Sequence, residues 1–138
     1  MQSDLTHLET AHPLLKKLFI AVAGKFPIQV LDSERGKAAQ DAAFAHGFSK
    51  VRYGNSAHNY NPSLAVDVVP LPLDWNNRKP FYALAKIVLP IAKSLAIPIR
   101  WGGDFNQDGN LSNDTFVDLP HYELNPWRDY KSQSKLAP

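Results

Sequence analysis

The chain of 138 residues contains no cysteine, which removes two kinds of stabilisation from consideration. Without cysteine there can be no disulfide framework and no thiolate metal ligand. A bound metal ion would therefore have to be held by histidine, aspartate or glutamate side chains. The search for a metal site is thus restricted to a few residues.

The sequence also lacks a long uninterrupted apolar run. Its most apolar region, residues 81–99, contains two lysines and two prolines and is a poor candidate for a membrane span. The N-terminus has neither the basic start nor the apolar block of a secretory signal peptide. We therefore expect synthesis in the cytoplasm, no signal peptide and no stable membrane insertion.

No block of charge of one sign is present. The 15 basic and 13 acidic residues give a net charge of +2, and the basic residues are scattered along the chain. A nucleic-acid-binding protein typically gathers lysine and arginine on one face, and no such pattern is evident. We expect no nucleic-acid partner and a monomer.

What is present is an ordinary globular composition, with 44% hydrophobic and 20% charged residues. This length suits one domain, and we predict a single domain over residues 1–138. The tail, residues 125–138, has few core-forming side chains beyond Trp127 and Tyr130, and we expect its end to fray.

Hydrophobic spacing, alanine content and turn residues predict the secondary structure. The predicted helices are residues 12–26, 34–47 and 81–96, the last containing Pro90, and the predicted strands are residues 28–32, 64–70, 97–103 and 116–124. Residues 48–63 are predicted to be a polar loop. The fold class is α+β, with helices packed on a small, mainly antiparallel sheet.

Asp67 interrupts the apolar strand predicted at residues 64–70. Alternation along that strand places its carboxylate on a face with small and apolar neighbours, where an unpaired charge is costly. One explanation is that Asp67 caps a turn or pairs with an arginine such as Arg52 or Arg100. The other is that it binds a divalent metal ion.

Two histidines could complete such a metal site. His58 precedes Asp67, and His121 lies in the later segment DLPHYEL. Two imidazoles, one carboxylate and a water form the open tetrahedral set of a catalytic zinc site. Asp118, three positions before His121, could exchange a proton with that water, with a strand-edge cap as the alternative.

Three segments carry a family resemblance: SAHNYNPSLAVDVVP, IRWGGDFNQDG and DLPHYEL. In this order they resemble the zinc peptidases of peptidoglycan stem peptides, which are the D-alanyl-D-alanine carboxypeptidases and the phage L-alanyl-D-glutamate endopeptidases. The resemblance covers residues 32–124. It implies zinc ligands at His58, Asp67 and His121, with Asp118 as general base and acid.

The same resemblance implies a catalytic role for Arg35, which would stabilise the developing oxyanion or bind substrate. It places Gln40 and Ser56 beside the site as substrate-binding residues. Trp101, in the segment RWGG, is a further candidate for substrate contact, and a place in the core is the alternative. The glycines after Trp101 allow a sharp turn or a close backbone approach.

The segment DFNQDG predicts a second kind of metal site. Asp104, Asn106 and Asp108 fit the first half of a calcium loop, in which oxygen ligands alternate along the chain. The second half departs from that pattern, because Thr115 stands where a bidentate glutamate is needed and Asp114 substitutes imperfectly. Some related phage enzymes have a calcium-responsive loop here, so we hypothesise a weak regulatory Ca²⁺ site. A plain Asx-turn loop is the alternative.

Together these features imply a zinc endopeptidase that cuts the L-alanyl-D-glutamate bond of bacterial peptidoglycan. Such a protein would be a phage endolysin, held in the host cytoplasm and acting at the cell wall after release. A D-Ala-D-Ala carboxypeptidase would share the metal chemistry. A non-catalytic, zinc-stabilised wall-binding module remains open as well, although it would have no need of Asp118.

The basic, aromatic tail either contacts anionic wall polymer or is a solvated end with one packed tryptophan.

Overall fold

The computed structural model describes residues 1–105, 107 and 118–138. Its α-helices are α1 (Pro13–Ala23), α2 (Lys37–Ala45) and α3 (Lys79–Ser94), and its short 3₁₀ helices are η1 (Thr6–Thr10), η2 (Ala57–Asn59) and η4 (Trp127–Gln133). Its strands are β1 (Ile28–Asp32), β2 (Tyr60–Asn61), β3 (Ala65–Pro70), β4 (Ile99–Trp101), β5 (His121–Leu124) and β6 (Lys135–Leu136). The predicted α+β class is confirmed.

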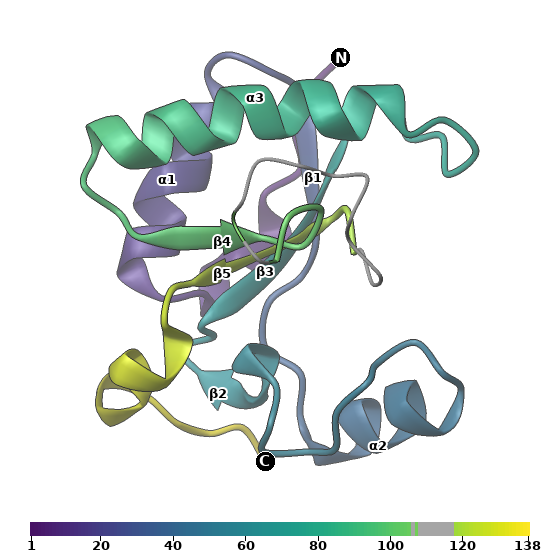
Figure 1. Cartoon of the computed structure of the whole chain (residues 1–138), viewed down its shortest axis with the longest axis vertical. Helices are drawn as coiled ribbons and strands as arrows, with labels where there is room; N and C mark the ends of the chain where they lie inside the picture. The colour runs from purple at the N-terminus through teal and green to yellow at the C-terminus, as the bar shows by residue number, and fades with distance from the viewer. Residues whose placement is uncertain (106, 108–117) are drawn as a thin grey trace.

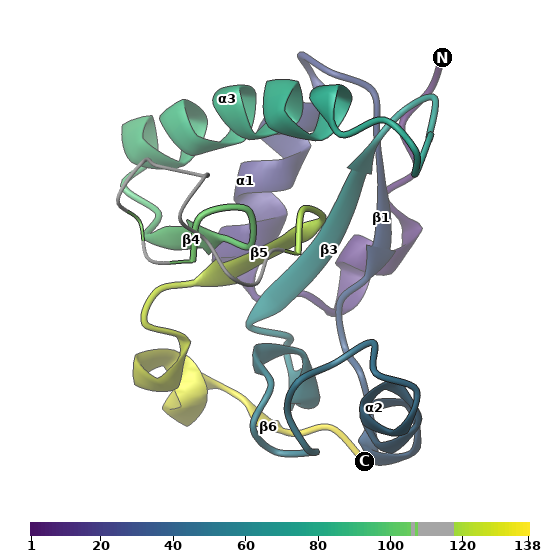
Figure 2. The same cartoon turned by 45° about the vertical axis from the view of Figure 1, so that its right-hand side comes forward.

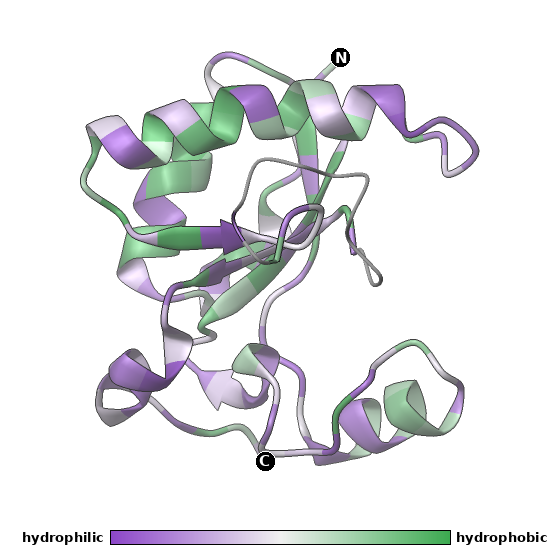
Figure 3. Ribbon diagram, in the orientation of Figure 1, coloured by the Kyte–Doolittle hydropathy of each residue, from purple (hydrophilic) through white to green (hydrophobic). Residues whose placement is uncertain are grey.

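A four-stranded antiparallel sheet with the order β1-β3-β5-β4 forms the centre of the molecule. Helix α1 lies behind it and α3 crosses its upper end (Figure 1). Their apolar faces form one core with the sheet, and Phe19 of α1 contacts the ring of Tyr122 on β5. Hydrophobic residues concentrate accordingly in β3, α1 and α3 (Figure 3).

Helices α1 and α3 follow from local signals in the sequence. The side chain of His12 accepts a hydrogen bond from the Leu14 amide, and Pro13 occupies the first helical position, which needs no amide donor. Helix α3 continues through Pro90 to Ser94. No helix of the described residues is long and apolar enough to cross a membrane.

The strand register determines which side chains share the open face of the sheet. Asp67 lies directly opposite His121, and Glu123 lies opposite Ala65 on one side and Arg100 on the other. Partners in an antiparallel pair project to the same face, as do residues two apart on one strand. Asp67, His121, Glu123 and Arg100 are therefore on one face, away from the core.

The segment predicted as a polar loop, residues 48–63, contains η2 and the short strand β2. A capping box starts η2: the Ser56 hydroxyl accepts from the backbone after it, and the Asn59 side chain accepts from the Ser56 amide. This local pattern of Ser and Asn three residues apart is readable in the sequence. The other predicted elements differ mainly at their ends, and residues 116–117 of the last predicted strand lie outside the described part.

The tail, residues 125–138, whose end the sequence predicts to fray, makes long-range backbone contacts in the structure. Strand β6 pairs with β2, and the Ala137 amide donates to the Asn59 carbonyl at 2.8 Å. The Lys37 amide donates to the Pro138 carbonyl at 3.3 Å, at the start of α2. These long-range backbone contacts hold the chain end beside α2 (Figure 2).

Candidate metal centre and active-site cleft

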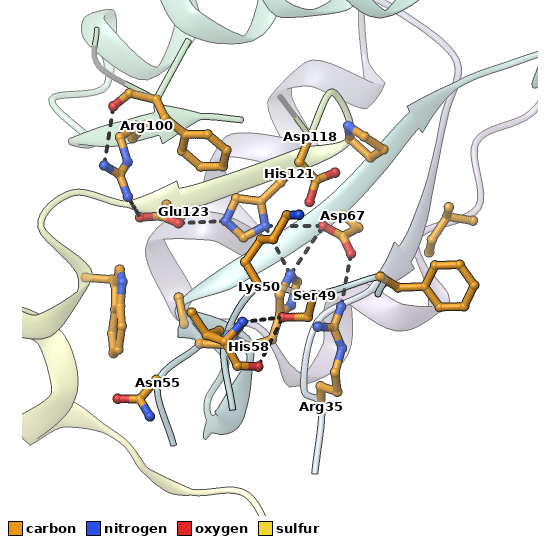
Figure 4. A pocket seen from close by; sticks show the side chains of 18 of the residues that line it. Arg35, Ser49, Lys50, Asn55, His58, Asp67, Arg100, Asp118, His121 and Glu123 are labelled. Atoms are coloured by element: carbon orange, nitrogen blue, oxygen red, sulfur yellow. Dashed lines mark hydrogen bonds and ion pairs between the residues drawn. The ribbon is translucent and has the colours of Figure 1, made fainter. Parts of the chain in front are cut away.

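His58, Asp67 and His121 bring three donor atoms together at the open face of the sheet (Figure 4). His58 Nε2 lies 3.2 Å from Asp67 Oδ1 and 3.2 Å from His121 Nδ1, and His121 Nδ1 lies 3.4 Å from Asp67 Oδ1. Ligands of a tetrahedral zinc ion with bonds of about 2.0–2.1 Å stand about 3.3–3.4 Å apart. The donor triangle therefore fits a tetrahedral metal ion, and the sequence-predicted ligands are found together.

Hydrogen bonds on the outer sides of the two imidazoles orient them toward this triangle. His58 Nδ1 donates to the Ser33 carbonyl at 2.7 Å, because a carbonyl can only accept. His121 Nε2 donates to Glu123 Oε1 at 2.6 Å. When each ring carries a single proton, that proton points away from the centre and the other ring nitrogen is free to bind a metal ion.

Glu123 is a functional residue that the sequence reasoning missed. It is buried, and Arg100 Nη2 donates to its second oxygen at 2.8 Å. Burial would raise the pKa of Glu123, but the hydrogen bond and charge of His121, together with Arg100, lower it below its usual range. The alternation in HYE could have revealed it, since residues two apart on a strand share a face.

Asp67 pairs with Arg35, whereas Arg52 and Arg100, the arginines suggested by the sequence, have other partners. Arg35 Nη2 lies 3.5 Å from Asp67 Oδ2, and its Nε donates to Asp32 at 3.2 Å. Arg100 pairs with Glu123, and Arg52 lies over the ring of Phe44. One carboxylate oxygen of Asp67 thus faces an arginine, and the other faces the imidazoles, where a metal ion could bind.

Gln40 and Ser56 support the site in different ways. Gln40 is fully buried, accepts from Arg35 Nη1 at 3.1 Å and donates to the Val51 carbonyl at 2.7 Å. It is absent from the cleft wall, so its contacts position Arg35. Ser56 lines the cleft and caps the short helix that carries His58.

The charges of the metal-free centre shift the pKa values of its groups. Burial would raise the pKa of Asp67, but the charge of His58 and hydrogen bonds from His121 and His58 hold it far below its usual range. Burial would lower the pKa of His121, but hydrogen bonds to Asp67 and Glu123 raise it to about 10. A proton on His121 therefore balances the carboxylates when no metal ion is bound.

Asp118 lines the same cleft as the three ligands. Its amide donates to the Gly102 carbonyl at 2.8 Å, and its carbonyl accepts from the His121 amide at 3.0 Å. A Cβ on Gly102 would collide with the Asp118 carbonyl, so the close approach requires glycine. Burial, followed by the negative charge of Asp67, raises the pKa of Asp118.

The cleft has a volume of about 580 Å³ and is lined by residues between Leu31 and Arg128. Trp101 is not part of its wall: the ring is buried and its Nε1 donates to the Leu119 carbonyl at 2.8 Å. This placement corresponds to the core alternative. Of the calcium candidates, Asp104 is described, whereas Asn106, Asp108 and Asp114 lie outside the described residues. The calcium site stays a prediction.

The sequence matches the family model of the phage L-alanyl-D-glutamate peptidases over residues 1–125. The chain belongs to the phage L-alanyl-D-glutamate peptidase family. Membership confirms the resemblance found in the three sequence segments. The C-terminal segment, residues 126–138, lies beyond the part of this peptidase chain that the family model matches.

A solved structure supports the same assignment. The peptidase chain is similar to the crystal structure of the Serratia marcescens L-Ala D-Glu endopeptidase ChiX, with 27% sequence identity and a TM-score of 0.73. The similarity covers 90% of this chain and 86% of that one. Comparison with curated proteins gives no match.

Proposed function

We propose that this protein is a zinc-dependent endopeptidase that hydrolyses the L-alanyl-D-glutamate bond of peptidoglycan stem peptides. The observation that carries the proposal is the donor triangle of His58, Asp67 and His121, whose edges fit a tetrahedral ion, with Asp118 in the same cleft. The family and the neighbouring structure indicate which peptide bond is cut.

Zinc, when bound by these residues, supplies a Lewis acid that polarises the scissile carbonyl. Asp118 accepts a proton from the attacking water and returns it to the leaving nitrogen. The water oxygen bonds to the carbonyl carbon, the carbon–nitrogen bond breaks, and D-glutamate leaves with a free amino group. The backbone bonds of Asp118 to Gly102 and His121 hold the carboxyl beside the ligands.

Arg35 serves this site in two ways. Its Nη2 contacts one oxygen of Asp67 and leaves the other directed at the imidazoles. Its guanidinium also lines the cleft, where a positive charge stabilises negative charge that develops on the carbonyl oxygen. Gln40 and Asn59 hold Arg35 from behind, through its side chain and its backbone carbonyl respectively.

The test is mass spectrometry of peptidoglycan fragments after digestion with the purified protein, with zinc and after chelation. Zinc-dependent fragments with a new D-glutamate amine are expected. Zinc-dependent release of terminal D-alanine would assign the alternative carboxypeptidase activity. Absence of cleavage with zinc bound would leave only a wall-binding module.

We further propose that the protein acts as a phage endolysin and as a monomer. It would accumulate in the host cytoplasm and reach the wall only when the membrane is opened. Expression in bacteria should cause lysis only when a membrane-permeabilising protein is co-expressed. Light scattering of the purified protein at several concentrations measures its oligomeric state.

A further inference from the structure

The two ends of the cleft differ in the side chains that they expose, because Trp127 is buried and Phe105 is half-buried where they line the cleft beside the arginines. We define the aromatic end by Phe48 and Trp75 and the basic end by Arg100 and Arg128, all of which line the cleft. The loop after α2 and the segment before α3 carry the aromatic end, on the right in Figure 1, whereas β4 and η4 carry the basic end on the left. The elements that carry the three metal-ligand candidates, η2, β3 and β5, lie between these segments in Figure 1.

The aromatic end is unusually exposed. Phe48 is 82% exposed and Trp75 is 60% exposed, although both are large hydrophobic side chains. A single exposed aromatic ring is common, but two rings at one end of the same cleft indicate a surface that a ligand covers. Trp75 stacks on Phe81 with ring centroids 5.7 Å apart, which supports the ring from behind.

The basic end has a cation available to a ligand. Arg100 is neutralised by Glu123, with Nη2 and Oε2 2.8 Å apart. Arg128 is exposed and lies over the ring of Trp127, 4.3 Å from its centroid. Within residues 1–105, 107 and 118–138, no carboxylate lies within ion-pairing distance of Arg128.

Peptidoglycan is asymmetric about the L-alanyl-D-glutamate bond in a corresponding way. On the amino side, one alanine separates the bond from the muramic acid of the glycan, whose sugar rings are uncharged and have apolar faces. On the carboxyl side, free carboxylates are carried by D-glutamate, by the terminal D-alanine and, where the third residue is a diamino diacid rather than lysine, by that residue as well. An aromatic ring packs well on a sugar face, and a guanidinium binds a carboxylate.

We propose that the cleft binds its substrate in one direction, with the muramyl sugar on Phe48 and Trp75 and the stem-peptide carboxylates at Arg128. This inference rests on the proposed function and adds the orientation of the substrate. It makes Phe48, Trp75 and Arg128 specificity-determining residues, outside the metal centre and its acid–base group.

Two substrate pairs and two variants test the orientation. One pair compares a muramoyl stem peptide with the same peptide carrying only an N-acetyl group, and the other compares stems with free and with amidated carboxylates beyond D-glutamate. R128Q should raise KM about two- to fivefold for the free-carboxylate stem and leave the amidated stem unchanged, as for an exposed ion pair. F48A should raise KM for the muramoyl peptide and leave the N-acetyl peptide unchanged.

Matched controls separate these effects from general damage. Arg52 is also exposed and lies over an aromatic ring, 4.5 Å from the Phe44 centroid, but it is not part of the cleft wall. R52Q should therefore leave KM unchanged for both the free-carboxylate and the amidated stem. Ile20 is 59% exposed on α1, outside the cleft, so I20A is the control for F48A. Melting curves and zinc content verify that each variant is folded and loaded.

The outcomes distinguish the orientation from the proposed function. If F48A changes the KM preference between free and amidated stems, and R128Q changes the preference between muramoyl and N-acetyl peptides, the substrate binds in the opposite direction. If neither variant alters either preference, the two ends do not recognise the substrate and the inference is wrong. Failure of the wild-type protein to cut any of the four compounds contradicts the proposed function, and calorimetric binding of the same compounds still tests the orientation.

Discussion

The central sheet and the loop-rich lobe below it, which comprises α2, η2, β2 and β6, supply the metal centre by different means. The sheet contributes Asp67 and His121, which are opposite each other in an antiparallel pair. The lobe contributes His58, on a short capped helix whose imidazole is held by the Ser33 carbonyl. The sheet ligands therefore depend on strand register and a charged partner, whereas the lobe ligand depends on caps and backbone hydrogen bonds.

The largest effect on activity is expected from replacing Asp118, which takes part in the proposed reaction but is not a metal ligand. Asp118→Ala should lower kcat by about 10²–10⁴-fold, because general acid–base catalysis is lost, and should leave zinc bound. Zinc stoichiometry and turnover of a stem peptide, measured on the same preparation, check both parts. Full activity in this variant would exclude Asp118 from the mechanism.

The second largest effect is expected from replacing Glu123, the charged partner of His121. Glu123→Gln should weaken zinc binding by about 10–100-fold, because the outer hydrogen bond to His121 loses its charge and Arg100 loses its partner. Competition with a chelator of known affinity gives the change. The comparison between the two regions would be wrong if zinc affinity stayed at the wild-type value.

The pH dependence of zinc binding tests the role of the charged groups around His121. His121 has its pKa raised to about 10 without metal, so zinc must displace its proton, and affinity should rise about tenfold per pH unit between pH 6 and 8. Calorimetry in buffers of different ionisation enthalpy should show about one proton released per zinc. In Glu123→Gln the proton release should shrink.

The same shift has a consequence for the metal-free protein. A group whose pKa is raised on folding stabilises the folded state fully below its unfolded value, near 6.5, and this contribution is lost as pH rises toward about 10. The metal-free protein should therefore lose stability between these pH values. Zinc-saturated protein should show less of this dependence, because no proton occupies His121.

The smallest effect on zinc is expected from the lobe. Removing residues 135–138 eliminates β6 and the bonds of Ala137 and Pro138 to Asn59 and Lys37, at a cost of about 2 kcal/mol in unfolding free energy. Zinc affinity should fall less than tenfold, because both sheet ligands stay in place. Urea unfolding measures the loss, and Leu136→Ala, at a side chain 53% exposed, is the matched control expected to be neutral.

Much of the fold could be predicted because its signals are local. Apolar spacing and Pro13 indicate α1, and the β-branched run at residues 28–32 coincides with β1. The candidate ligands could be found because Asp67 stands in an apolar strand, which is costly without a cation. In contrast, η2 was missed because it spans only three residues, and β2 was missed because it spans two residues and its pairing partner β6 lies at the end of the chain.

By itself, the sequence determined the residue types and the alternation that make a zinc site possible: His58, Asp67 and His121, with Asp118 three positions before the last. Only the tertiary structure decided that Arg35 rather than Arg100 pairs with Asp67, that Glu123 supports His121, and that Trp101 lies in the core. The reason is physical. Periodicity and caps act between neighbours in the chain, whereas strand register and the packing of the C-terminal segment are set by contacts between residues far apart in sequence.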